Sequence, residues 1–316
     1  ADGCLQNRTV APLPAIFTEI SIPARRCEER DKAAGSAGME AGGLDSDGRQ
    51  FKNAKEMWKE EIGEEGDTRR RAEWYSKGVG YWQGVDATLD GVLGGFANVN
   101  EADIAGSEAF LKTLLPDFMD GGRSRHLVAL DCGSGIGRVT KNLLVRYFNE
   151  VDLVEPVRHF LESAQESLAS GKLAVSNSHK ACNFFCLPLQ EFTPVMGRYD
   201  VIWIQWCIGQ LNDADFISFF KRAKAGLKPG GVFVLKENIA STGFVLDKDD
   251  QSVTRSDSYF TELFSQSGLH LYKSKVQKGF PDGLFAVKMY ALTAEKPKRV
   301  NTRRARVQTN KPSTIN

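Results

Sequence analysis

From residue 127 onward, short apolar runs alternate with longer amphipathic stretches. The runs are rich in β-branched and aromatic residues and predict strands at 127–131, 151–155, 182–186, 200–205, 231–236 and 285–292. The amphipathic stretches predict helices at 137–147, 157–170, 213–226 and 257–267. Alternation of strands and helices predicts an α/β fold, in which a mostly parallel sheet carries helices on both faces.

Residues 1–72 show neither pattern. The stretch 33–48 is rich in glycine, alanine and serine, and charged residues surround it. We therefore predict a disordered or optional N-terminal extension over 1–72, with at most a short helix at 51–61. Because Met39 is the first methionine, we expect residues 1–38 to be upstream or optional sequence.

A helical segment is predicted at 73–122, ahead of the sheet. Apolar spacing predicts helices at 71–84 and 103–115, and the second is expected to end at Pro116. Between them, the Gly-Gly pair of Leu93-Gly94-Gly95 indicates a loop with unusual backbone angles or a close approach of another segment. The loop is either an ordinary turn or a wall over a bound chain segment.

Composition and charge narrow the class of protein. No apolar run approaches the ~20 residues of a membrane helix, so no membrane association is predicted. Seven basic residues and no acidic one follow Glu295, and we predict a basic disordered tail at 295–316. This tail is a nuclear address, a nucleic-acid patch or a solvated end, and nucleic-acid binding is not expected elsewhere. Cys182 and Cys186 lack a second ligand pair, so no metal site is predicted.

A glycine-rich turn lies between the first predicted strand and the helix that follows it. Residues 130–138 read Leu-Asp-Cys-Gly-Ser-Gly-Ile-Gly-Arg. The glycines let a ligand approach the backbone, and the helix N-terminus offers free N–H groups. Glu155 ends the next strand, where a carboxylate can accept hydrogen bonds from ribose hydroxyls. These features predict a nucleoside-containing cofactor without deciding which one.

The same turn resembles the first motif of class I S-adenosylmethionine-dependent methyltransferases. The resemblance implies a Rossmann-like sheet of seven mostly parallel strands and S-adenosylmethionine as cofactor. It implies that Gly133 approaches the methionine portion and that Arg138 pairs with its carboxylate. It also implies that Leu189-Gln190 holds the adenine and that 228–231 forms the turn before the fifth strand. The cofactor-binding set is then Gly133, Gly135, Arg138, Glu155, Leu189, Gln190 and Gln205.

Longer motifs resemble the protein α-N-terminal methyltransferase family. They are Trp74-Tyr75 with Tyr81-Trp82, the stretches 90–95, 189–194, 199–209 and 246–253, and Lys236-Glu237-Asn238. The resemblance covers about 73–294, which we predict to be the methyltransferase domain, with 73–122 covering the substrate and 123–294 forming the cofactor-binding sheet. This family methylates the free α-amine of proteins that begin X-Pro-Lys/Arg after removal of methionine. We therefore expect such proteins as substrates and partners.

The resemblance also implies roles at the substrate end of the pocket. Asp250 is expected to accept the proton of the amine, directly or through water. Asn238 is expected to hold the first substrate residues through backbone hydrogen bonds. Asp247, with Ser252, is expected to receive the lysine or arginine at substrate position 3.

Apolar residues are expected to shape the substrate channel. Trp82, Leu93 and Gly94 would wall it, and Trp206 would pack on the substrate proline. The sequence departs from the family at Gln210, where family members commonly carry a histidine that assists deprotonation of the amine. A glutamine amide cannot act as a base, so Gln210 either orients the amine or leaves deprotonation to the neighbouring carboxylate.

Two other classes of function share these cofactor motifs. One is a methyltransferase for a small metabolite, and the other is a non-catalytic protein that binds S-adenosylmethionine. The acidic stretch 247–250 and the Leu-Gly-Gly loop favour a cationic peptide as substrate. We expect a monomer or weak dimer in the cytoplasm and nucleus. The number of methyl groups added does not follow from the sequence.

Overall fold

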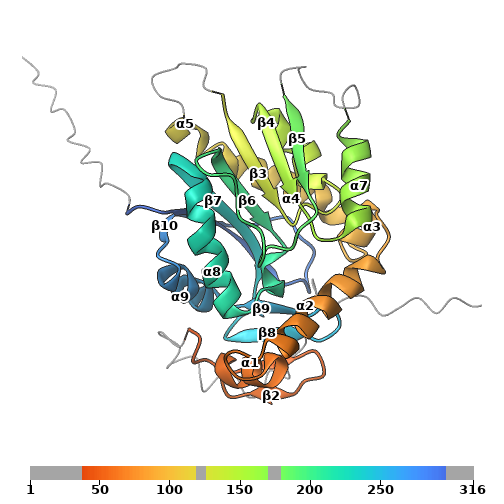
Figure 1. Ribbon diagram of the computed structural model, residues 1–316, viewed down its shortest axis with the longest axis vertical. Coiled ribbons are helices and arrows are strands. Elements are labelled where there is room, and N and C mark those ends of the chain that lie inside the picture. Colours follow the sequence, from red (N-terminus) through yellow and green to blue (C-terminus); the bar gives the residue numbers. More distant parts are fainter. Residues whose placement is uncertain (1–37, 119–125, 170–178, 297–316) are drawn as a thin grey trace, which may run out of the picture.

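A seven-stranded sheet forms the centre of the molecule (Figure 1). The structure is a computed structural model that describes residues 38–118, 126–169 and 179–296. The strand order is β10-β11-β7-β6-β3-β4-β5, parallel from β7 to β5, with β11 antiparallel to both of its neighbours. The predicted α/β fold with a mostly parallel sheet is thus confirmed. The strands are β3 (Val128–Cys132), β4 (Glu150–Val154), β5 (Lys180–Phe185), β6 (Tyr199–Gln205), β7 (Leu227–Ile239), β10 (His270–Val276) and β11 (Ala286–Thr293).

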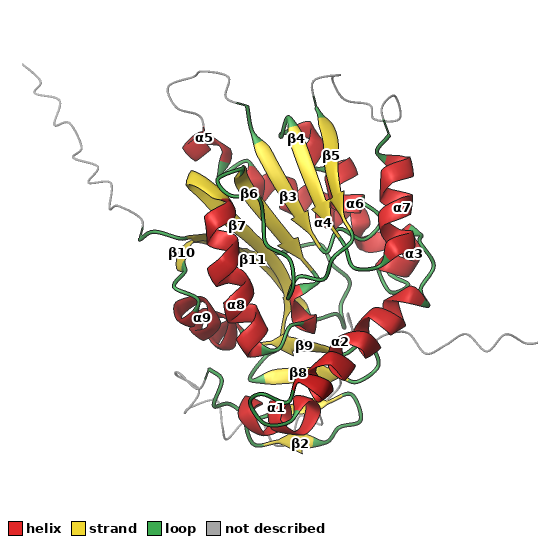
Figure 2. Cartoon of the chain, viewed as in Figure 1, coloured by secondary structure: helices red, strands yellow, loops and turns green. Residues whose placement is uncertain are grey.

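Helices cover both faces of this sheet (Figure 2). One layer contains α8 (Asp213–Ala223) and α9 (Asp257–Gln266), and the other contains α4 (Asn100–Leu111), α6 (Arg138–Asn142) and α7 (Arg158–Ser167). Alternate residues of β6 enter the two cores. Ile202 and Ile204 pack in the core under α8 and α9, whereas Val201 and Trp203 pack in the other. Because successive side chains of a strand point to opposite faces, the apolar run 201–204 contributes to both layers.

A second sheet lies at one end of the molecule, beside α1 and α2 (Figure 1). Its order is β2-β1-β8-β9, and β1 pairs in parallel with β8. β8 and β9 form an antiparallel hairpin, whose turn carries Asp250. The elements are β1 (Gly43–Asp45), β2 (Gln50–Phe51), α1 (Ala54–Ile62), α2 (Thr68–Gln83), β8 (Phe244–Asp247) and β9 (Ser252–Arg255).

Residues 43–72 are folded in the structure, whereas the sequence predicted disorder with at most a short helix at 51–61. That helix is present as α1, but the strands β1 and β2 and the packing of this segment were not predicted. Met57 and Trp58 of α1 are buried in the core cluster that also contains residues of α8 and α9. The indole N–H of Trp58 donates to Asp213 Oδ2 at 2.9 Å. The residues that α1 contacts, in α8 and α9, lie more than 150 positions later in the sequence. The local pattern of residues in 43–72 therefore could not predict these contacts. Residues 1–37 and most of the predicted basic tail lie outside the described residues.

Several element boundaries also differ from the predicted ones. The helix predicted at 137–147 ends as an α-helix at Asn142 and is followed by a 3-10 turn, Leu144–Arg146. The helix predicted at 103–115 is α4, and Pro116 does not follow it directly but lies in the first turn of the separate α5 (Leu115–Phe118), where a proline is tolerated. β8, β9 and β10 were not predicted. β10 is an edge strand with much exposed surface, so it lacks the apolar run that identified the buried strands.

Polar residues fix where the helices near the cavities begin. The Thr88 hydroxyl accepts the N–H of Gly91 at the start of α3 (Leu89–Val92), at 3.0 Å. The Asn212 side chain accepts the N–H of Asp215 at the start of α8, also at 3.0 Å. Such caps satisfy one of the free N–H groups of a first helical turn. Within the described ranges, no helix has both the length and the apolar character that crossing a membrane requires.

Candidate active site

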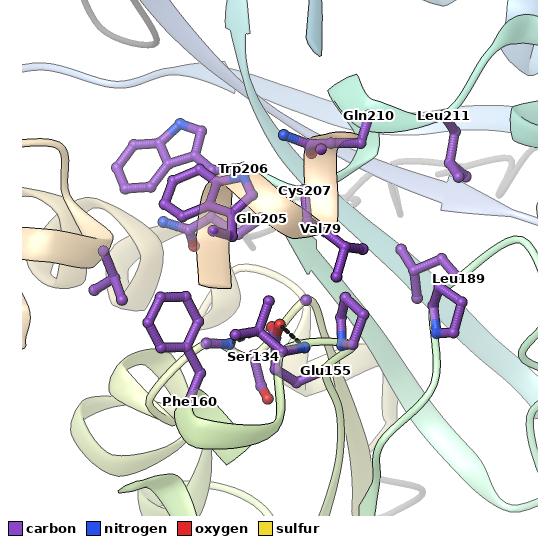
Figure 3. Close-up of a pocket in the computed structure, with 18 of the residues that line it drawn as sticks. Val79, Ser134, Glu155, Phe160, Leu189, Gln205, Trp206, Cys207, Gln210 and Leu211 are labelled. Atoms are coloured by element: carbon purple, nitrogen blue, oxygen red, sulfur yellow. Dashed lines mark hydrogen bonds between the residues drawn. The ribbon is translucent and has the colours of Figure 1, made fainter. Parts of the chain in front are cut away.

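The carboxyl ends of β3, β4 and β6 open into a pocket that α2 closes from the other side. Glu155 lies on one side of this pocket, and Trp206 and Gln210 lie on the opposite side (Figure 3). Residues from α2, including Trp74 and Trp82, complete the wall. All the residues predicted to bind the cofactor line this pocket: Gly133, Gly135, Arg138, Glu155, Leu189, Gln190 and Gln205.

The glycines of the turn after β3 adopt left-handed backbone conformations. Their φ angles are 62° at Gly133, 54° at Gly135 and 75° at Gly137. A Cβ added at Gly133 would lie 2.3 Å from the Cβ of Cys207. Residues other than glycine rarely adopt such φ angles. At Gly133 a side chain would also collide with Cys207, just after the end of β6. The turn therefore requires glycine for its own conformation and for the close approach of β6.

Two buried carboxyl groups flank the turn. Glu155 accepts the N–H of Gly135 through Oε2 and the N–H of Val157 through Oε1, both at 2.9 Å. Burial raises the pKa of Glu155 to about 7. Asp131 accepts the Thr140 hydroxyl at 2.6 Å, and burial raises the pKa of Asp131 to about 6. Each oxygen of Glu155 retains a second lone pair, which suits it to accept hydroxyl groups of a ribose.

A buried charged group that the sequence did not predict lies behind the pocket. It consists of Asp103, Arg138 and Lys236, and we call it the Asp103 cluster. Asp103 Oδ2 accepts Arg138 Nη1 at 2.6 Å, and Asp103 Oδ1 lies 2.5 Å from Lys236 Nζ. Gln205 Nε2 donates to both carboxylate oxygens, at 2.9 and 3.0 Å. Arg138 is thus ion-paired within the protein as well as facing the cofactor pocket, which the sequence-based prediction did not include.

A second, smaller cavity meets the first. Four side chains line both cavities, namely those of Trp82, Val92, Trp206 and Gln210. The remaining residues of its wall are Gly209, Glu237, Asn238, Asp250, Ser252, Val253 and Thr254. The structure therefore brings together most of the residues predicted for substrate binding and catalysis. Ligands held in the two cavities would meet at the four shared side chains.

Asp250 is fully buried in the wall of the second cavity. Its Oδ1 accepts the Ser252 hydroxyl at 2.6 Å, and its Oδ2 has no hydrogen-bond partner among the residues that the structure describes. Burial, together with the negative charge of Asp247, raises the pKa of Asp250. A buried carboxyl with a raised pKa and an unused acceptor oxygen is suited to take up a proton.

Three predicted substrate-binding residues lie outside both cavity walls. Leu93 is buried in a small apolar cluster, Gly94 follows it with a φ of 57°, and the residue of this loop that lines both cavities is Val92. Asp247 is buried at the end of β8, and its Oδ1 accepts the N–H of Asp249 at 2.9 Å. The turn between β8 and β9 thus directs one acidic side chain to the cavity and keeps Asp247 behind it.

Glu237 lines the second cavity and was not predicted as a site residue. Its Oε1 accepts the N–H of Cys207 at 3.0 Å and the N–H of Ile208 at 3.2 Å, and burial raises the pKa of Glu237 to about 7. Glu237 thereby holds the turn after β6, where Trp206 has a left-handed φ of 52°. Left-handed angles in a bulky residue are rare and often occur at functional sites. The sequence feature that could have indicated Glu237 as a site residue was the motif Lys236-Glu237-Asn238, which resembles the family.

Gln210 occupies the junction of the two cavities. Its backbone carbonyl accepts the indole N–H of Trp74 at 2.7 Å, so α2 is tied directly to the turn after β6. The side-chain amide can donate and accept hydrogen bonds but cannot take up a proton at neutral pH.

Comparison with known proteins decides the family. Residues 70–293 match the model of the family described as AdoMet-dependent proline di-methyltransferase. The chain belongs to this family. A solved S-adenosylmethionine-dependent methyltransferase from Leishmania major is 39% identical, with a TM-score of 0.71, and the match covers 80% of this chain and 96% of that chain. Alpha N-terminal protein methyltransferase 1 of Arabidopsis thaliana is 62% identical, over 88% of this chain and all of the relative. N-terminal Xaa-Pro-Lys N-methyltransferase 1 of Xenopus tropicalis is 39% identical, over 70% of this chain and 96% of the relative.

The family assignment makes this chain a methyltransferase that uses S-adenosylmethionine, as the glycine turn predicted. The pocket fits that cofactor: the turn at Gly133 has no room for a Cβ, Glu155 has acceptors suited to the ribose, and Arg138 offers a cation to the carboxylate. Residues 38–69 precede the matched range, yet β1 in this segment extends the sheet that carries Asp250.

Proposed function

We propose that this methyltransferase methylates the free α-amino group of proteins that begin X-Pro-Lys or X-Pro-Arg once methionine is removed. The name of the Arabidopsis relative supports methylation at a protein N-terminus, and the name of the Xenopus relative supports an Xaa-Pro-Lys terminus. The observation that carries the proposal is the second cavity, which meets the cofactor pocket at Trp206 and Gln210 and has the buried Asp250 in its wall. A chain terminus can enter a small cavity of this kind more easily than a chain segment that continues in both directions.

The amine must lose a proton before it can react, because an α-amine has a pKa near 8 and is mostly an ammonium at pH 7. When bound, S-adenosylmethionine supplies an electrophilic methyl group. The residues of this chain orient the amine and take its proton. We assign the proton to Asp250, whose Oδ1 is held by the Ser252 hydroxyl at 2.6 Å, which leaves Oδ2 as the acceptor. Much of the rate would come from positioning the amine against the methyl group.

The remaining residues of the second cavity are assigned to the first three substrate residues. Asn238, which is buried in the wall, has the donor and acceptor that a peptide backbone requires. The rings of Trp82 and Trp206 are proposed to enclose the proline. Asp247 lies outside the wall, so we propose that its charge attracts the lysine or arginine at position 3 without lining the channel. Ser252 acts mainly by holding Asp250.

Gln210 is proposed to orient the amine through its side-chain amide. It lies where the cofactor and substrate cavities meet, so it is within the region through which the methyl group must pass. Since an amide cannot accept the proton, deprotonation falls to Asp250 in this chain.

A pair of matched peptides tests the proposal. The protein is incubated with S-adenosylmethionine and either Ser-Pro-Lys-Arg peptide with a free N-terminus or the same peptide with an acetylated N-terminus, and products are identified by mass spectrometry. We expect methyl groups on the α-amine of the free peptide, in a number that the spectrum reports, and none on the acetylated one. Equal methylation of both peptides would contradict α-amine specificity. Methylation of neither peptide, together with methyl transfer to small-molecule amines in a parallel incubation, would indicate a metabolite as the substrate.

Cellular location and oligomeric state are proposed from the sequence alone. We propose that the protein acts in the cytoplasm and nucleus as a monomer or weak dimer. Size-exclusion chromatography with light scattering tests the second point, and fluorescence imaging of a tagged full-length chain, with and without residues 297–316, tests the first.

A further inference from the structure

The Asp103 cluster joins elements that are distant in the sequence. Lys236 of β7 contacts the Asp103 carboxylate of α4 and also donates to the Asp103 carbonyl at 3.1 Å. Its other acceptors are the Ser107 hydroxyl at 2.9 Å and the Gln277 side-chain oxygen at 2.8 Å. The side chains of Asp103 and Lys236 have no exposed surface. Such complete enclosure of an ammonium is costly unless the ammonium is paired with a negative charge and its N–H groups are hydrogen-bonded.

The charges in this cluster do not balance. Asp103 contributes one negative charge, whereas Arg138 and Lys236 contribute two positive charges. The other hydrogen-bond partners of these side chains, such as Asn100 and Gln205, are neutral. Burial lowers the pKa of Lys236 to about 8, so the ammonium remains the main form at pH 7. The hydrogen-bonded cluster therefore carries one surplus positive charge, beside a pocket that Arg138 lines and Lys236 does not. The carboxyl of Asp131 also lines this pocket and interacts electrostatically with Arg138, but its hydrogen bond is to the Thr140 hydroxyl.

We propose that Asp103 and Lys236 are positioning residues that set the charge of the cofactor pocket. Asp103 orients Arg138 through the 2.6 Å hydrogen bond to Nη1. Lys236 offsets the negative charge of Asp103, so that the positive charge of Arg138 remains available to a ligand. The carboxylate of S-adenosylmethionine is the group that balances the surplus. Without Lys236, Asp103 and Arg138 would balance each other, and the carboxylate would meet a neutral pair.

The cluster also supports the wall between the two cavities. The guanidinium carbon of Arg138 lies 5.5 Å from the centroid of the Trp206 ring, and Lys236 Nζ lies 5.9 Å from it. Cations at this distance are attracted to the face of an aromatic ring. Because Trp206 lines both cavities, cofactor binding is measured without peptide and with two ligands that differ only in the carboxylate, so that an effect of Trp206 common to both ligands cancels.

The test compares two ligands that differ only in the carboxylate. Calorimetry measures the binding of S-adenosylhomocysteine and of its decarboxylated analogue, which keeps the ammonium, to the wild type and to Lys236→Met. We expect the substitution to weaken S-adenosylhomocysteine about tenfold or more, because one full charge is lost in a site of low dielectric. Binding of the decarboxylated analogue should be unchanged or tighter. Lys228→Met, which removes the 2.6 Å pair with Asp200, is the matched control and should alter neither affinity.

Two further variants separate charge from structure. Asp103→Asn and the double variant Asp103→Asn/Lys236→Met both keep at least one positive charge and a side-chain oxygen that can accept the hydrogen bond of Arg138, so both should bind S-adenosylhomocysteine within about threefold of the wild type. If Lys236→Met alone does not fold, these two variants decide the matter. The proposal would be overturned if Lys236→Met weakened the binding of both ligands equally, or if the double variant bound S-adenosylhomocysteine more weakly than either single variant. Asp103 and Lys236 would then have a structural role only.

Discussion

Replacing Asp250 by asparagine is the most direct test of the proposed chemistry. The substitution keeps the shape of the side chain and its ability to accept the Ser252 hydroxyl, which lies 2.6 Å from Oδ1 in the wild type. It removes the group that is proposed to take the proton. An effect on the rate would then report proton transfer and not the loss of packing in the cavity wall.

The structure indicates how large the effect should be. An ordinary carboxyl has a pKa near 3.9 and an α-amine a pKa near 8, so moving a proton between them costs about 5.5 kcal/mol. Burial of Asp250, with the charge of Asp247, raises the pKa of Asp250 and removes much of that cost. General base catalysis typically contributes about 10²–10⁴-fold. We therefore expect Asp250→Asn to lower kcat by about 10²-fold or more at pH 7.

The assay is methyl transfer to a Ser-Pro-Lys-Arg peptide, followed by mass spectrometry from pH 6.5 to pH 9.5. Above the pKa of the α-amine the substrate is already neutral, so the deficit of Asp250→Asn should shrink to about tenfold or less. Asp249→Asn is the matched control, since Asp249 is the exposed neighbour of Asp250 and lies outside both cavities. Its kcat should stay within about threefold of the wild type.

Two results would refute the reasoning. If Asp250→Asn retained a kcat within about threefold of the wild type at pH 7, another group would have to accept the proton. If the deficit were the same at pH 7 and pH 9.5, Asp250 would act in substrate binding alone, because a base is not needed when the amine is neutral.

Three further predictions concern the turn, the N-terminal segment and the buried carboxyl. Gly133→Ala should weaken S-adenosylhomocysteine binding about 10²-fold, because its Cβ would lie 2.3 Å from the nearest side-chain carbon; Gly48→Ala, with a φ of 83° and open space around it, should leave binding unchanged. Trp58→Phe should lower the free energy of unfolding in urea by about 1.5–3 kcal/mol, because it removes the 2.9 Å hydrogen bond to the carboxylate of Asp213; no change would mean that this bond does not tie α1 to the domain. Glu155 has a raised pKa of about 7 in the folded chain, so its contribution to stability is present at low pH and is lost as the pH rises through 7. Relative to the wild type, Glu155→Gln should therefore gain about 1–3 kcal/mol of unfolding free energy between pH 5 and pH 8 without ligand, and a constant difference would contradict the raised pKa.

The core of the fold was predictable because its strands are buried on both faces. β3 and β6 are buried along their whole length, and their central residues, 128–130 and 201–204, appear in the sequence as continuous apolar runs. The unpredicted strands have mixed exposure. Buried residues alternate with half-buried ones in β9, and β8 has one half-buried residue among three buried ones. The partners β1 and β2 are only three and two residues long. A short strand of this kind is stabilised by its neighbours, which a local pattern does not reveal.

The cofactor site was predictable for a related reason. A glycine turn and an acidic residue at the next strand end are local motifs, and a parallel sheet brings the ends of its strands to one edge. The substrate cavity was harder to predict from the sequence, because its wall combines residues from separate elements: α2, α3, the turn after β6 and the β8–β9 hairpin. In the sequence, Asp247 and Asp250 are equivalent members of one acidic stretch. In the structure only Asp250 lines the cavity, because the reversal between β8 and β9 orients them differently.

The sequence by itself determined the α/β class, the glycine turn, the carboxylate at Glu155 and the family to which the chain belongs. Each of these is recorded in a short stretch of residues, where spacing alone fixes which side chains share a face. Only the tertiary structure decided that Asp103, Arg138 and Lys236 meet, and that residues 43–62 are folded against β8 and α8. From the sequence alone, Asp103 cannot be distinguished from a polar residue on the exposed face of a helix. Its burial depends on partners from other elements. Contacts between elements that are distant in the sequence produce no periodic pattern of apolar and polar residues from which they could be predicted.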